Sequence, residues 1–227
     1  MSSEILISLI TLIFLEIILG IDNIIFISLL TDKLPAENRK KARLIGLSLA
    51  LILRLVLLAG ISWILKLDQT LFTVYGNNFS GKGIILIVGG LFLLYKSSKE
   101  IFEKIEDHHN DEFKKTTSFK NTIGQILLLD LVFSVDSIIT AVGLVDELWI
   151  MYAAVIISIS IMLAISKNIS NFINKHPSLK VLALAFLMMI GLTLIAEGFN
   201  LHIPKAYIYF SMAFSFFVNM IQIKKKV

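Results

Sequence analysis

The sequence contains no cysteine among its 227 residues, and this absence narrows the chemistry that the chain can perform. Without cysteine there is no disulfide framework, no thiolate metal site and no thiol nucleophile. Any metal ligand must therefore be an oxygen atom or an imidazole nitrogen. The four histidines lack the spacing of a metal-binding motif, so we expect them to be solvated: His108, His109, His176 and His202.

The chain also lacks a glycine-rich phosphate-binding motif, which argues against ATP as a source of energy. Charged residues are scarce, at 17%, whereas apolar residues make up 56% of the chain and its mean hydropathy is +0.84. This composition is far from that of a soluble domain and predicts an integral membrane protein. The first apolar stretch has no basic leader and no small-residue cleavage site, so we expect a retained membrane helix there.

Apolar runs long enough to cross a bilayer as helices recur along the chain. A shorter run, at 83–95, is predicted to continue as an amphipathic helix through Ile101 and Phe102, because Lys82 and Lys96 can reach the membrane interfaces. We therefore predict an all-α membrane protein with seven transmembrane helices, at residues 5–30, 44–65, 83–95, 123–145, 148–165, 179–196 and 203–223.

The basic residues set the predicted orientation of these helices. Of the 21 lysines and arginines, 17 follow odd-numbered helices, three lie on the other side, and Arg54 lies inside the second helix. Because cytoplasmic loops are enriched in lysine and arginine, the N-terminus is predicted outside and the C-terminus in the cytoplasm. Leaving out the third helix would place its six following lysines outside, so we retain it.

An acidic pattern occurs twice, in the first and the fourth predicted helices. Glu16 and Asp22 are six residues apart, and so are Asp130 and Asp136, which lie 114 residues later. The first and fourth helices cross the membrane in opposite directions, so we predict two inverted-topology three-helix repeats in a single membrane domain. The repeats occupy 1–106 and 119–200, joined by a charged cytoplasmic loop at 107–118 and followed by a seventh helix and basic tail at 201–227.

These acidic residues are candidate metal ligands. An unpaired charge inside a bilayer costs at least about 2.5 to 3.5 kcal/mol, so four buried carboxylates need a cation. Gly20 and Ser134, which lie between the paired acids, predict a break in each helix that brings the acids together. A set of oxygen ligands suits a hard divalent ion such as manganese, magnesium or calcium. The predicted ligands are Glu16, Asp22, Asn23, Asp130 and Asp136, with Ser137 and Arg54 as accessory residues. The alternative is that the acids are hydrogen-bonded packing groups without a metal.

Arg54 lies at the centre of the second predicted helix and does not lose its proton in proteins. It must therefore find an anion. One hypothesis is a counter-ion that keeps a site carboxylate ionised and takes the place of the metal after release. The other hypothesis is a fixed ion pair between helices, and the sequence does not distinguish the two.

The two acidic segments, with three further stretches, resemble the TerC family of bacterial membrane proteins. The matching segments are LEIILGIDNIIFIS (15–28), LILR (51–54), GGLFLLYK (89–96), DLVFSVDSI (130–138) and IPKAYIYFSMAFS (203–215). The resemblance implies a manganese exporter of the cytoplasmic membrane, in a family named for tellurium resistance in which some members load manganese onto secreted enzymes. It also implies a metal-binding role for each of the matching residues Glu16, Asp22, Asn23, Asp130 and Asp136.

The expected function is therefore secondary transport that exports Mn²⁺ as the transported ion, in exchange for protons and without an organic cofactor. A metal-delivery protein that interacts with export machinery or secreted metalloproteins is an alternative. An intramembrane aspartyl protease is disfavoured because it needs two acids rather than four, and because the Gly-x-Gly-Asp and Pro-Ala-Leu segments of presenilin-like enzymes are missing. We expect no enzyme activity and no nucleic-acid partner. The expected partners are membrane lipid, a divalent ion and these proteins.

Overall fold

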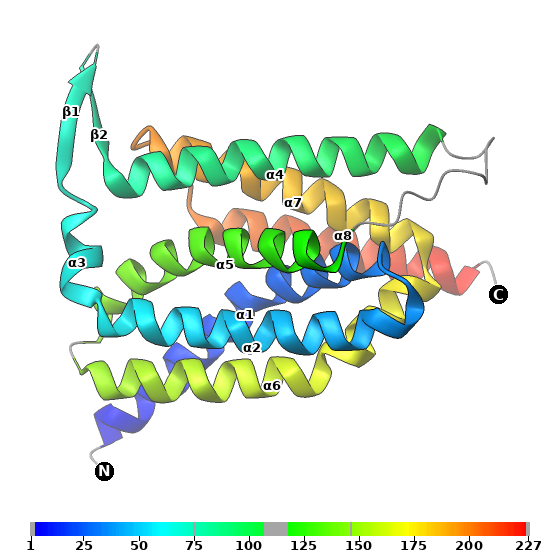
Figure 1. Ribbon diagram of the computed structural model, residues 1–227, viewed down its shortest axis with the longest axis horizontal. Coiled ribbons are helices and arrows are strands. Elements are labelled where there is room, and N and C mark those ends of the chain that lie inside the picture. Colours follow the sequence, from blue (N-terminus) through cyan, green and yellow to red (C-terminus); the bar gives the residue numbers. More distant parts are fainter. Residues whose placement is uncertain (1–2, 75, 107–117, 146, 226–227) are drawn as a thin grey trace. The chain divides into compact units, whose positions relative to one another are not determined.

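The computed structural model describes residues 3–74, 76–106, 118–145 and 147–225, without the side chains of residues 3, 22, 104–106 and 223–225. This part of the chain forms eight helices and one antiparallel pair of strands (Figure 1). The elements are α1 (Ser3–Asp32), α2 (Ala36–Ala59), α3 (Ile61–Lys66), β1 (Thr70–Val74), β2 (Asn77–Ser80), α4 (Gly81–Glu106), α5 (Phe119–Val142), α6 (Leu148–Lys175), α7 (Pro177–Gly198) and α8 (Lys205–Lys225). The prediction of a mainly helical chain is confirmed. The charged loop predicted at 107–118 lies outside the described residues, apart from Ser118.

Five of the described helices, α1, α2, α5, α6 and α7, are long and apolar enough to cross a membrane. Helix α4 has 26 residues and α8 has 21, so both also have spanning length. Lysines and other polar residues interrupt or flank the apolar runs of both helices, and neither is among the five. The helical membrane class is therefore confirmed, and the number of seven crossings stays a prediction.

The apolar run predicted as the second membrane helix, at about 44–65, is divided between two helices in the structure. Helix α2 begins earlier, at Ala36 directly after Pro35, and it ends at Ala59. Gly60 interrupts it, and its N–H donates to the carbonyl oxygen of Val56 at 3.0 Å. Glycine is a poor helix former and a common residue at helix ends, which accounts for the separate short helix α3 that follows.

The breaks predicted at Gly20 and Ser134 are wrong, because α1 and α5 are continuous helices. A Cβ atom on Gly20 would overlap the sulfur of Met162, so this glycine allows α6 to approach α1 closely. The Ser134 hydroxyl donates to Oδ2 of Asp130 at 3.3 Å instead of to a freed backbone carbonyl. Both residues therefore serve side-chain contacts, and the helical backbone remains intact.

The described residues separate into two compact units, each of which draws on both predicted repeats. Unit 1 contains α1, α2, α3, α5 and α6 as far as Asn171. Unit 2 contains the strands, α4, α7, α8 and the last turn of α6. In unit 1, α1 and α5 run in opposite directions, whereas α2 and α5 run in the same direction (Figure 1). The three helices pack against one another, and their shared interior holds the candidate site.

In unit 2, α4 and α7 are antiparallel and touch through glycine backbones. A Cβ atom on Gly90 would lie 2.5 Å from the carbonyl oxygen of Gly191, and one on Gly191 would lie 2.9 Å from that of Gly90. The same reciprocal contact joins Gly83 and Gly198, at 2.9 and 2.7 Å. Real Cβ atoms do not approach backbone oxygen so closely, so side chains are excluded here. Small residues that let backbones meet are typical of packing between membrane helices.

Unit 2 also contains a β-hairpin that the sequence analysis did not predict. Strands β1 and β2 pair antiparallel, and Gly76 in the turn has a φ of 82° that glycine adopts without strain. Phe79 stacks on Phe72 at 5.4 Å between ring centroids and meets the edge of Phe199 at 5.6 Å. The side-chain amide of Asn200 donates to the carbonyl oxygen of Asn78 at 2.6 Å. These contacts attach the hairpin to the C-terminal end of α7.

Candidate functional site

Arg54 binds both acids that occupy equivalent places in the repeated pattern. Its Nη1 donates to Oε2 of Glu16, on α1, and its Nη2 donates to Oδ1 of Asp130, on α5, at 3.3 Å. The three residues are almost completely buried, with exposed fractions of 2% for Arg54, 3% for Glu16 and 6% for Asp130. One guanidinium on α2 therefore links α1 and α5, and this provides the anion that a buried arginine requires.

The charges in this triad do not balance. Two carboxylates meet one guanidinium, so in its fully ionised form the triad has one negative charge in excess. Hydrogen bonding is also incomplete, because Nε of Arg54 is buried and has no acceptor among the described residues. A buried donor without a partner is uncommon in native structures and calls for an explanation. In its fully ionised form, the triad is therefore neither electrically neutral nor fully hydrogen-bonded.

The second acid of α5, Asp136, is also buried, with an exposed fraction of 7%. It lies six residues beyond Asp130, next to Ser137, whose hydroxyl donates to the carbonyl oxygen of Ser134 at 3.3 Å. Asn23, on α1, is likewise buried. The backbone of Asp22 belongs to α1, but its side chain lies outside the described part.

The predicted arrangement of four clustered carboxylates stays a prediction. Among the described side chains, no three acidic or histidine residues lie close enough together to hold one metal ion. This set does not include the side chain of Asp22. The structure does bring together Glu16 and Asp130, through Arg54, and it buries the remaining described candidates Asn23, Asp136 and Ser137 in the same unit.

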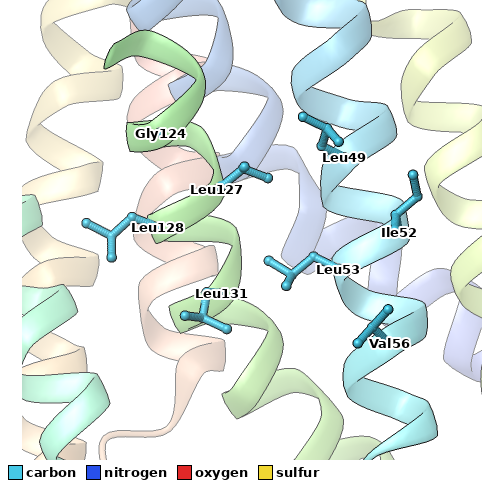
Figure 2. Close-up of a pocket in the computed structure, with 8 residues that line it drawn as sticks. All are labelled: Leu49, Ile52, Leu53, Val56, Gly124, Leu127, Leu128 and Leu131. Carbon is cyan, nitrogen blue, oxygen red and sulfur yellow. The ribbon is translucent and has the colours of Figure 1, made fainter. Parts of the chain in front are cut away.

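Apolar side chains lie next to Glu16. Glu16 lines a small cavity together with Leu12, Leu58 and five other apolar residues, and the space is about that of one water molecule. Separately, an open groove of about 520 Å³ lies between α2 and α5, where Leu53 and Leu127 point toward one another (Figure 2). The groove is lined by Leu49, Ile52, Leu53, Val56, Gly124, Leu127, Leu128 and Leu131. Its lining side chains offer no metal ligand.

A buried polar contact between α1 and α6 was not predicted from the sequence. The hydroxyl of Ser28 donates to the hydroxyl oxygen of Ser170 at 2.8 Å, and neither residue is exposed. Thr31, one turn further along α1, is equally buried and donates to the carbonyl oxygen of Ser28 at 3.1 Å. The only signal in the sequence is that these hydroxyl residues follow Asp22 and Asn23 in the same helix.

The two described histidines belong to unit 2, whereas the triad belongs to unit 1. His176 is at the start of α7, where its Nδ1 lies 2.9 Å from the carbonyl oxygen of Phe172, and His202 lies in the exposed segment before α8. His108 and His109 are outside the described residues.

Comparison with known proteins gives consistent matches over almost the whole chain. The model of a family described as "Integral membrane protein TerC family" matches residues 1–226. A protein of Haemophilus influenzae described as "UPF0053 protein" is 50% identical over 97% of this chain and 94% of its own length. The "UPF0053 inner membrane protein YgdQ" of Escherichia coli K12 is 50% identical over 95% of this chain and 92% of its own. The "UPF0053 inner membrane protein YoaE" of the same strain is 51% identical over 93% of this chain but only 41% of its own. No solved structure matches.

Proposed function

Because the chain belongs to the TerC family of integral membrane proteins, we propose that it is a secondary transporter that exports Mn²⁺ from the cytoplasm in exchange for protons. One observation carries the proposal. The buried charged side chains of the described residues are three acids and one base: Glu16, Asp130, Asp136 and Arg54. This excess of negative charge within helices of membrane-spanning length favours a cationic substrate.

The proposed ligands are those that the repeated pattern identifies. Carboxylate oxygens come from Glu16, Asp22, Asp130 and Asp136, an amide oxygen comes from Asn23, and Ser137 and Arg54 are accessory. The burial of Asp136 and Asn23 supports this set, because acids and amides buried in membrane helices are expensive and usually functional. All donors are oxygen atoms, which favour manganese, magnesium or calcium over softer metals.

The proposed architecture has seven transmembrane helices, with α4 and α8 as the two further crossings, and an inverted repeat. The α4–α7 contact supports the repeat. Gly83 and Gly90 are seven residues apart in α4, and Gly191 and Gly198 are seven apart in α7. Gly83 of α4 meets Gly198 of α7, and Gly90 of α4 meets Gly191 of α7. A two-fold axis between equivalent helices would produce this reciprocal pattern, so the contact supports α4 and α7 as the third helices of the two repeats.

Export needs a source of energy in the orientation that we propose, with the N-terminus outside the cytoplasmic membrane and the C-terminus inside. Moving a divalent ion outward against an inside-negative potential of 100 mV costs about 4.6 kcal/mol. Metal ligands must be deprotonated to bind, so metal binding releases protons and metal release allows protons to return. Exchange for external protons therefore supplies both the energy and a neutralising charge.

The test is transport by the purified protein in liposomes that contain a manganese-sensitive dye. Asp136→Asn should reduce Mn²⁺ flux to the level of protein-free liposomes, because it removes one buried carboxylate at nearly constant volume. Glu147→Gln is the matched control, since Glu147 is an exposed acid just before α6, and it should transport normally. A parent protein that binds Mn²⁺ without moving it would favour the metal-delivery alternative. Flux that ignores an imposed pH gradient would reject proton exchange.

A further inference from the structure

The guanidinium of Arg54 lies between the two carboxylates that the repeated pattern pairs, Glu16 and Asp130. We propose that Arg54 is a tethered competitor of the transported ion: a cation that binds between the two carboxylates takes the place of the guanidinium on at least one of them. This inference rests on the proposed function, in which Glu16 and Asp130 are ligands. In this role, Arg54 excludes cations that bind the two carboxylates too weakly to displace its guanidinium.

The way in which Arg54 is held favours displacement. A guanidinium binds a single carboxylate most strongly through two parallel hydrogen bonds. Arg54 instead divides its two terminal nitrogens between Glu16 and Asp130, with one bond to each. Its Nε has no acceptor among the described residues, so part of its bonding capacity is unused. The long, flexible stem of arginine allows the charged head to move while the helix stays in place.

The charges determine which ions succeed. The Coulomb energy of an ion with a pair of carboxylates scales with the charge of that ion, and it is large where the dielectric constant is low. A divalent cation neutralises both Glu16 and Asp130, whereas the guanidinium or a monovalent cation neutralises only one of them. Sodium and potassium therefore gain no charge advantage over Arg54, and a divalent ion does. Arg54 thereby becomes a determinant of selectivity for divalent ions.

The first experiment measures Mn²⁺ binding to the purified full-length protein by isothermal titration. Arg54→Gln removes the competitor. The dissociation constant of this variant for Mn²⁺ should therefore be at least about tenfold lower than that of the parent. The triple variant Glu16→Gln, Arg54→Gln, Asp130→Asn removes the competitor and both ligands at similar volume. It should lose most of its affinity for Mn²⁺. If Arg54 is a fixed brace and its two acids are not metal ligands, the triple variant should bind Mn²⁺ as the parent does. That result would overturn the inference.

The second experiment replaces the tethered cation with a free one. In Arg54→Ala, millimolar guanidinium should weaken Mn²⁺ binding in a concentration-dependent way, because it enters the space that the side chain occupied. Urea is the matched control, since it has nearly the same shape and no charge, and it should have no effect. The parent should respond to neither compound. Equal effects of guanidinium and urea in Arg54→Ala would contradict competition.

The outcomes separate this inference from the proposed function. If the parent binds Mn²⁺ and Arg54→Gln binds it no more tightly, Arg54 is not a competitor, and the proposed function is untouched. If the parent itself fails to bind Mn²⁺, the proposed function fails, and this inference fails with it. Should Arg54→Gln not fold, Arg54→Lys provides the same test, because a lysine ammonium is a point charge without the two-pronged geometry and competes less well for two carboxylates.

Discussion

The two units hold their helices together in opposite ways. In unit 1, α1, α2 and α5 meet through Arg54 and two acids, so charge joins the helices. In unit 2, α4 and α7 meet through four glycines, so backbone atoms are in direct contact. A charged contact can be exchanged for another partner, such as an ion, whereas a contact between backbones has nothing to exchange. We infer that adaptable chemistry belongs to unit 1 and structural rigidity to the α4–α7 pair of unit 2.

The largest effect on stability is expected from Arg54→Gln, which breaks the charged contact. Removing one partner of a buried ion pair typically costs about 3 to 5 kcal/mol, because the remaining charges stay buried without compensation. Neutralising all three residues together should restore most of the loss. Unfolding in detergent, followed by circular dichroism, measures both variants. An Arg54→Gln protein as stable as the parent would show that the charges do not hold unit 1 together.

Gly90→Ala, in the backbone contact of unit 2, is expected to lower the free energy of unfolding by a smaller amount, about 1 to 3 kcal/mol. The added methyl group would lie 2.5 Å from the carbonyl oxygen of Gly191, so the two helices must separate. Gly124→Ala in α5 is the matched control, since no described atom lies within 4 Å of a Cβ placed there. It should raise stability by up to about 1 kcal/mol, because alanine favours a helix more than glycine does. The same unfolding measurement compares them, and equal effects would refute the close contact.

The smallest effect is expected from Ser28→Ala, which removes the hydroxyl pair between α1 and α6. Hydrogen bonds between membrane helices contribute about 0.6 kcal/mol on average, so the loss should be near that value. Ser160→Ala is the control, because Ser160 is exposed and donates only within its own helix, to the carbonyl oxygen of Ile156. A loss as large as that of Arg54→Gln would mean that unit 1 depends on hydroxyl contacts as much as on charge.

The sequence was sufficient to predict the helical class and the candidate acids, because both depend on local patterns. Apolar runs predict helices by themselves, and four acids in two such runs at equal spacing are conspicuous. The same reasoning identified Arg54 as a residue that needs an anion. It did not identify the anions, because which carboxylate reaches Arg54 depends on how α1, α2 and α5 pack, and no local pattern encodes that packing.

The errors have the same physical origin. Gly20 was interpreted as a helix break, but its role is to admit Met162 from α6, a partner 142 residues away in the sequence. The hairpin was missed because its strands have only five and four residues and because Phe199 and Asn200, which hold it, come from the end of α7. The pairing of Ser28 with Ser170 is likewise decided by tertiary packing, since serine is common in apolar helices.

The spacing of the glycine contacts restricts how α4 and α7 can move. Because they touch at two places, Gly83 with Gly198 and Gly90 with Gly191, sliding one helix past the other would replace a glycine with a bulky neighbour at both places at once. A ratchet by one helical turn, which is a common form of switching between packed helices, is therefore blocked. Any rearrangement of these two helices must carry α4 and α7 together as one rigid body, by tilt or rotation.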